Sequence, residues 1–165
     1  MKECFIRKSI KINASGPNVW NTLTKRESTD QWAAEFSSGG PRFHIESDWT
    51  PGSPVLWKDE HGTIIVEGNV TAFEENKLLR FTVFDVRRPQ PLFTEKDGIT
   101  YELAEQDGKT TLQITHGDFS VLTEGKKYRD LSAKVWDRVL PKIKRLAENQ
   151  ELEAQNEQHE YLIGN

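Results

Sequence analysis

The fold is decided by the stretch SIKINASGPNVWNTLT, residues 9–24. Its first half continues an alternation that begins at Phe5, in which isoleucines take one face and polar side chains the other. Residues 5–13 are therefore predicted to form a strand that is buried on one side. A helix follows, because Ser15 or Gly16 can cap it and a proline at position 17 suits a first turn. The stretch thus predicts a strand that leads directly into a short helix.

The chain beyond this stretch has the pattern of an antiparallel meander. A second short helix is predicted over residues 29–34, before a Ser/Gly/Pro connector at 37–41. Alternating runs then extend from Phe43 to Gly117, and short turns separate them at His61-Gly62, Asn76-Lys77 and Asp107-Gly108. Two prolines within residues 87–91 cannot lie in a central strand, so we expect an exposed loop there.

The longest predicted element is a helix that begins near Thr123. An apolar stripe at three- and four-residue steps is formed by Tyr128, Leu131, Val135, Val139, Ile143 and Leu146. Beyond Asn149 the chain is rich in Gln, Glu and Asn, with few apolar residues. We therefore expect one domain over residues 1–149 and a polar tail, frayed or disordered, over residues 150–165.

These elements favour an α+β fold. A twisted antiparallel sheet with one apolar side needs that side covered, and only the final helix is long enough to cover it. We expect a curved antiparallel sheet wrapped on a long C-terminal helix, with two short helices after the first strand.

Composition excludes several classes of protein. The chain has 165 residues, a net charge of −4, one cysteine and no apolar run of the length that a membrane span needs. The single cysteine, Cys4, excludes an internal disulfide framework and a Cys-cluster zinc site. An isoelectric point near 5.6 argues against a nucleic-acid binder. The first residues lack the apolar core of a signal peptide, so we expect no membrane insertion and a cytoplasmic protein.

Several segments together resemble a known family. The opening stretch, Trp32, residues 68–82 and the run from Val135 to Leu146 are similar to the START-like (SRPBCC) superfamily, in particular its Hsp90-ATPase-activator-homologue (AHSA1-like) branch. The similarity spans residues 5–148. It implies the helix-grip fold of START-like and Bet v 1-like proteins, with a cavity between sheet and last helix. Members of the superfamily bind lipids, sterols, polyketides or hormones, and the branch is named after a co-chaperone of Hsp90.

Large aromatic side chains are the candidate ligand-binding residues. Four of these side chains are predicted to point inward from a strand or from the last helix: Trp57, Phe81, Tyr101 and Trp136. Two others, Trp32 and Phe36, border the connector. An apolar pocket with few polar groups is typical of a hydrophobic-ligand site. Because aromatic rings also fill solid cores, the pattern leaves both readings open.

Catalytic and metal-binding signals are sparse. His116 shares a strand phase with Leu112 and Ile114 at the strand's end, where it could orient a ligand carbonyl or act as an acid or base. Tyr101 is a second weak acid/base candidate, and both residues could equally be packed into the core. His44 and Glu46 share one side of a strand, but no third ligand is evident, so we expect no metal and no cofactor.

A basic stripe is predicted on the last helix. Its residues are Lys134, Arg138, Lys142 and Arg145, which could dock an acidic partner or form a solvated face.

Three functions follow from these patterns. The first is binding of a small hydrophobic molecule between the sheet and the last helix, by a monomer or weak dimer. The second, which only the resemblance implies, is an interaction with an Hsp90-type chaperone that activates its ATPase. The third is catalysis on a hydrophobic substrate, of the cyclase or hydrolase kind, with His116 and Tyr101 as acid/base candidates.

Overall fold

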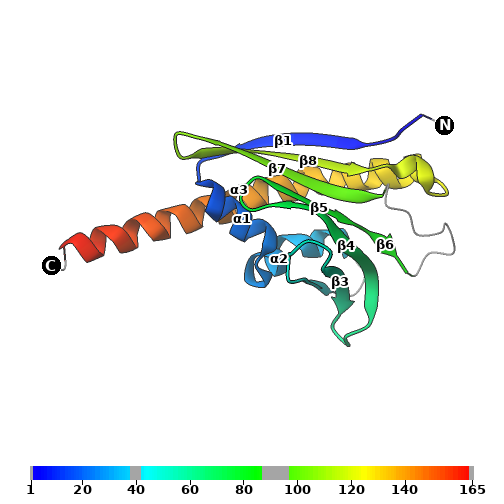
Figure 1. Ribbon diagram of the computed structural model, residues 1–165, viewed down its shortest axis with the longest axis horizontal. Coiled ribbons are helices and arrows are strands. Elements are labelled where there is room, and N and C mark those ends of the chain that lie inside the picture. Colours follow the sequence, from blue (N-terminus) through cyan, green and yellow to red (C-terminus); the bar gives the residue numbers. More distant parts are fainter. Residues whose placement is uncertain (1, 38–41, 87–96, 164–165) are drawn as a thin grey trace.

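The computed structural model describes residues 2–37, 42–86 and 97–163 (Figure 1). The elements in chain order are β1 (Ile6–Ile12), α1 (Gly16–Thr24), α2 (Arg26–Trp32), the 3₁₀ helix η1 (Ala33–Ser37), β2 (Phe43–Glu46), β3 (Pro54–Asp59), β4 (Ile64–Glu74), β5 (Leu78–Thr82), β6 (Phe84–Asp85), β7 (Gly98–Gln106), β8 (Lys109–Gly117), the 3₁₀ helix η2 (Phe119–Val121) and α3 (Gly125–Ile163). The loop predicted at residues 87–91 lies outside the described residues.

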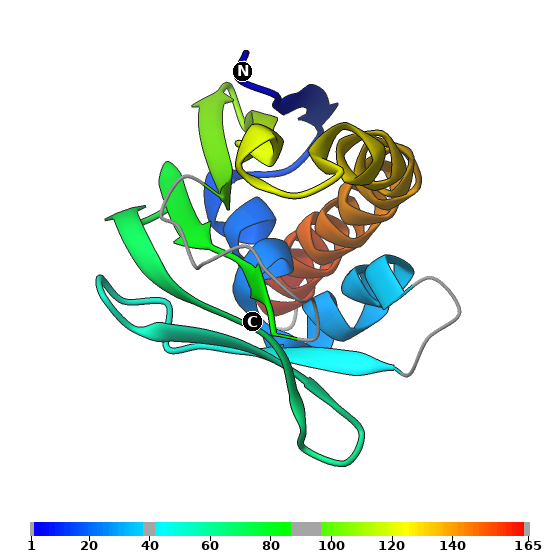
Figure 2. The same cartoon turned by 90° about the vertical axis from the view of Figure 1, so that its right-hand side faces the viewer.

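The strands form one curved sheet in the order β1-β8-β7-β5-β4-β3-β2, with the short β6 paired to β4. All of these pairings are antiparallel. Figure 2 shows the sheet bending around the helices, which lie on its concave side. This arrangement confirms the predicted α+β architecture, in which the apolar face of the sheet is covered by helices.

The opening stretch folds as its sequence predicts. In β1 the side chains of Ile6 and Ile12 are buried while Arg7 and Lys11 point to solvent. Ser15 is the N-cap of α1, and its hydroxyl oxygen accepts a hydrogen bond from the backbone N–H of Asn18. The second helix begins at Arg26, three residues earlier than predicted, and continues as η1.

Helix α3 covers the sheet with a buried arc of Val135, Trp136, Val139, Ile143 and Ala147. The predicted apolar stripe is therefore largely correct. Leu131 is the exception, since its side chain is 51% exposed at the margin of the buried arc.

The end of α3 differs from the frayed tail that composition predicted. The helix continues to Ile163, and its last turns extend past the sheet (Figure 1). The Gln150 amide donates to the hydroxyls of Thr22 and Ser28 at 3.0 and 3.2 Å. Glu151 accepts hydrogen bonds from the backbone of Ser15 and the side chain of Asn18. These contacts join the start of the polar segment to α1 and α2, with partners that an apolar-stripe argument does not consider.

The inner face of β4 carries Gly68, whereas Glu67 and Asn69 are exposed on the other face. The sequence left the direction of these two side chains open. A Cβ atom at Gly68 would lie 1.8 Å from the carbonyl oxygen of Thr82, so a glycine is needed for β5 to approach this closely.

Among the described residues, none of the helices combines the length and the hydropathy needed to span a bilayer.

Candidate functional site

A cavity of about 190 Å³ lies between the sheet, η1, η2 and α3. Its apolar wall includes Phe36, Phe43, Trp57, Ile65, Val66 and Phe119. Polar groups on the same wall are Ser37, Asp85, Asp97, His116 and Ser132. Larger depressions of about 550 and 680 Å³ are lined mainly by charged and polar residues and, among the described residues, contain no aromatic side chain.

A β-bulge builds one wall of this cavity. Trp57 pairs with Val66, while the next residue, Lys58, pairs with Ile64, so Ile65 is an extra residue on β4. Two consecutive side chains, Ile65 and Val66, are consequently both buried and both line the cavity. The sequence signal was the apolar run Ile64-Ile65-Val66, which interrupts the alternation of this strand.

Trp57 is held within the wall by two other rings. Its indole is parallel to the Phe43 ring, with centroids 4.9 Å apart and an interplanar angle of 2°. The Phe36 ring lies 6.2 Å away and is tilted by 55°. The indole Nε1 is buried, and no described residue accepts its hydrogen. Trp57 therefore combines an apolar surface with a buried donor.

His116 lies at the end of β8 and is 8% exposed. Its Nδ1 accepts a hydrogen bond of 3.1 Å from the indole Nε1 of Trp136. An indole nitrogen can only donate, so Nδ1 carries no proton and the neutral imidazole carries its proton on Nε2. The ring also packs against Phe119, with centroids 4.7 Å apart. The structure thus fixes both the orientation and the tautomer of this residue.

The seven predicted ligand-binding residues divide into two groups. Phe36, Trp57 and His116 line the cavity. The other four are not among its lining residues and are at most 2% exposed: Trp32, Phe81, Tyr101 and Trp136. They pack in a ring cluster beside it, with centroid distances of 6.4 Å for Trp32–Trp136, 5.9 Å for Phe81–Tyr101 and 6.4 Å for Tyr101–Trp136.

Tyr101 illustrates the difference between facing inward and reaching a cavity. Burial raises the pKa of its phenol, so the hydroxyl keeps its proton at physiological pH. A protonated phenol outside the lining does not serve as a base for a molecule in the cavity.

Sequence reasoning missed several lining residues. Phe43 was predictable in principle, because it alternates with the buried Ile45 in β2. Phe119 and Ser132 were not, since one lies in a 3₁₀ turn and the other is a small polar residue on α3. Neither position has a periodic apolar signal.

The comparisons with known proteins agree with this geometry. The family model described as "Activator of Hsp90 ATPase homolog 1-like protein" matches residues 13–148. The chain belongs to this AHSA1-like family. No curated protein matches the chain in sequence.

Solved structures share the AHSA1-like fold. A protein of Cytophaga hutchinsonii has a TM-score of 0.69 and 24% identity, over 91% of this chain and 98% of that one. A protein of Mesorhizobium loti has a TM-score of 0.70 and 16% identity, over 88% and 98%. The Aha1 dimer of Colwellia psychrerythraea has a TM-score of 0.62 and 18% identity, over 88% and 96%. At these identities the likeness establishes the fold alone.

In this AHSA1-like domain, η1 is fastened to α3 beside the cavity. The Glu35 carboxylate binds Lys142 and also Arg138, the latter at 3.4 Å. The Lys142 ammonium, and to a lesser degree Arg138, hold the pKa of Glu35 below its usual value. Two members of the predicted basic stripe therefore bind an acidic group of the same chain.

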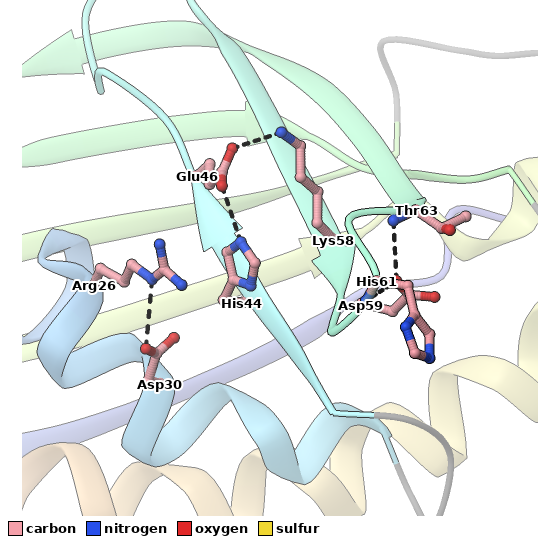
Figure 3. A network of polar contacts seen from close by, with 8 residues as sticks. All are labelled: Arg26, Asp30, His44, Glu46, Lys58, Asp59, His61 and Thr63. Carbon is pink, nitrogen blue, oxygen red and sulfur yellow. Dashed lines mark hydrogen bonds and ion pairs between the residues drawn. The ribbon is translucent and has the colours of Figure 1, made fainter.

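His44 and Glu46 are the two residues that the sequence placed on one side of a strand as possible metal ligands. They lie on the outside of the AHSA1-like fold. Figure 3 shows Glu46 between two partners, His44 at 2.9 Å and Lys58 at 2.8 Å. Lys58 and His44 hold the pKa of Glu46 below its usual value. Over residues 2–37, 42–86 and 97–163, no group of three potential metal ligands is found. Glu46 links β2 to β3 through its ion pair with Lys58.

Proposed function

We propose that the protein binds a small hydrophobic molecule in the cavity between the sheet and α3. The observation that carries this proposal is the enclosure of the cavity by aromatic rings of four separate elements: Phe36 of η1, Phe43 of β2, Trp57 of β3 and Phe119 of η2. Aromatic walls with a few convergent polar groups are typical of small-molecule sites.

The volume limits the size of the molecule. A cavity of about 150 Å³ lined by aliphatic and aromatic side chains is large enough for benzene. The cavity here, about 190 Å³, is slightly larger. We therefore expect a ligand of one ring, or an acyl group of similar size, in place of a sterol or a long-chain lipid.

Titration of the purified protein with acetophenone, followed by NMR, tests this proposal. A Ser132→Phe variant places a ring where a lining residue of α3 now stands, and should abolish binding. Its control is Leu131→Phe, which adds a ring at the neighbouring but exposed position of the same helix. Saturable binding to the wild type and to the control, but not to Ser132→Phe, would support the proposal. Equal binding to all three proteins, or no binding to any, would contradict it.

A second candidate function is activation of an Hsp90-type chaperone. It is favoured by the family match and by the likeness in fold to the Aha1 dimer. The test is the ATPase rate of the cognate Hsp90 with increasing amounts of this protein. A rate that rises to saturation would support an interaction, and an unchanged rate at high concentration would count against it.

A further inference from the structure

The hydrogen bond from Trp136 to His116 exists only while His116 is neutral. An indole nitrogen donates one hydrogen and accepts none, so its partner must be an imidazole nitrogen without a proton. The bond is 3.1 Å long, and both residues are buried. A proton on Nδ1 would place two donors against each other away from water, which costs free energy for both groups. Protonation of His116 and its bond to Trp136 therefore exclude each other.

This bond is in contact with the cavity wall at both of its ends. On the α3 side, the Phe36 ring lies edge-on against Trp136, with centroids 4.9 Å apart. On the β8 side, the Phe119 ring packs against His116 at 4.7 Å. Phe36, His116 and Phe119 all line the cavity. Because a close-packed interior transmits displacement, a change in the Trp136–His116 contact changes the shape of the cavity.

The elements around His116 carry ionisable groups of both signs. Those groups are Cys4 before β1, Lys8 of β1, Asp85 of β6, Asp97 before β7, Tyr101 of β7, Asp118 at the N-cap of η2, and Arg129 and Asp137 of α3. Lys8 and Asp137 are bound to each other. Arg129 donates to the carbonyl of Phe5 and pairs with its neighbour Asp130. These contacts occupy the cations of β1 and α3 with partners other than His116.

The carboxyl groups act on His116 in the opposite direction to Trp136. Asp85 and Asp97 line the same cavity as the imidazole, and Asp118 is two residues further along the chain. Nearby carboxylates favour the charged form of an imidazole, whereas burial and a hydrogen bond to the neutral ring oppose it. Whether His116 takes a proton therefore depends on a competition between these carboxylates and the bond to Trp136.

We propose that His116 is a pH switch of the cavity: when the imidazole takes a proton, it releases Trp136 and the cavity loses its ligand. Histidine is the side chain whose charge changes between about pH 5 and 8, so the signal is mild acidification. This regulation rests on the proposed function, whereas the release of Trp136 is measurable without any ligand.

The first measurement follows the free protein by NMR from about pH 7.5 to 5. The His116 ring should change from the Nε2–H form to the doubly protonated form, and the indole N–H resonance of Trp136 should move upfield with the same midpoint. Trp32 is the internal control, because its indole donates to the carbonyl of Thr22 at 2.8 Å and a carbonyl does not titrate. Amide hydrogen exchange around Trp136 should become faster below the midpoint.

The second measurement is the affinity for acetophenone over the same range. The neutral form of His116 should bind it, so the Kd should rise by up to about tenfold for each pH unit below the midpoint, as the exchange of one proton requires.

Two variants assign this effect to His116. His116→Asn offers an amide oxygen near the position of Nδ1, which can accept from Trp136 but does not titrate, so its affinity should be independent of pH. His61→Asn is the matched control, since it removes a histidine whose side chain is 81% exposed between β3 and β4, and it should keep the wild-type pH dependence. Should His116→Asn fail to fold, the wild-type titrations and the Trp32 control still decide the matter.

The outcomes separate this inference from the proposed function. Equally tight binding over the whole pH range, or a Trp136 resonance that does not follow the protonation of His116, would overturn the switch while leaving hydrophobic binding intact. Loss of helical circular dichroism over the same range would also overturn it, because unfolding would then account for the release. Absence of binding at neutral pH would overturn both the proposed function and its regulation.

Discussion

Trp136 of α3 donates the hydrogen of its indole to Nδ1 of His116 on β8, across 3.1 Å. Both residues are buried, and the bond joins the covering helix to the sheet at the side of the cavity. Because it fixes the imidazole as the neutral Nε2–H tautomer, it also determines which His116 nitrogen carries a proton.

A first prediction concerns this tautomer. In the wild type, long-range ¹H–¹⁵N correlations should show His116 protonated on Nε2 alone at neutral pH. Trp136→Phe removes the donor of this buried hydrogen bond, so it should lower the free energy of unfolding by about 1–3 kcal/mol and allow both tautomers. A wild-type His116 protonated on Nδ1 would contradict the assignment.

A second prediction concerns the order of η1. Glu35→Gln removes the negative charge that holds this 3₁₀ helix to Lys142 and Arg138. Solvent-exposed ion pairs contribute little to global stability, so we expect the free energy of unfolding to be nearly unchanged. Amide hydrogen exchange over residues 33–37 should nevertheless become faster, because the contact is local. Unchanged exchange in this segment would show that the ion pairs do not hold η1.

A third prediction is acid sensitivity at the junction of α3 with α1. The Asn18 side chain and the Ser15 backbone N–H hold the pKa of Glu151 below its usual value of 4.5. A carboxylate with a lowered folded-state pKa stabilises the fold above its unfolded pKa, and that contribution is lost as pH falls through the folded value.

Urea unfolding measured from about pH 6 down to pH 3 tests this effect. The wild type should lose stability more steeply below about pH 4.5 than Glu151→Gln, which has no charge to lose. Glu157→Gln, an exposed position further along α3, should follow the wild type. Parallel curves for all three proteins would contradict the prediction.

A fourth prediction separates core rings from lining rings. Phe81 is buried against Trp49 and Tyr101 and is not part of the cavity lining. Phe81→Leu should therefore lower the free energy of unfolding by about 1–2 kcal/mol. Affinity for acetophenone, measured by NMR titration, should stay within a factor of about two. A large loss of affinity in a folded Phe81→Leu protein would place this ring in the binding site.

Local signals in the sequence were sufficient for most of the fold. The Ser15 cap, the alternation of β1 and the hairpin turns at Gly62, Asn76 and Asp107-Gly108 are each defined by neighbouring residues. The positive φ angles at these turns explain why Asn, Asp and Gly marked them.

The cavity was harder to predict. Alternation along a strand shows which way a side chain points, but not whether the space beyond that side chain is filled. Phe81 and Trp57 both face inward, but Phe81 is buried against Trp49 and Tyr101, whereas Trp57 borders the cavity. The β3–β4 bulge that moves Ile65 into the wall depends on pairing between strands, which a single strand's pattern does not contain. The contacts of Gln150 with Thr22 and of Glu151 with Ser15 likewise join residues far apart in the sequence.

The most direct test of the central claim is the location of a bound ring. Intermolecular NOEs from acetophenone to the assigned side chains of the protein would identify it. We predict NOEs to Trp57, Phe119 and Leu122, which line the cavity from three elements or their connections, and their loss in Ser132→Phe. NOEs confined to residues outside the cavity, or none at a saturating concentration, would contradict the claim that this protein holds a small hydrophobic molecule beneath α3.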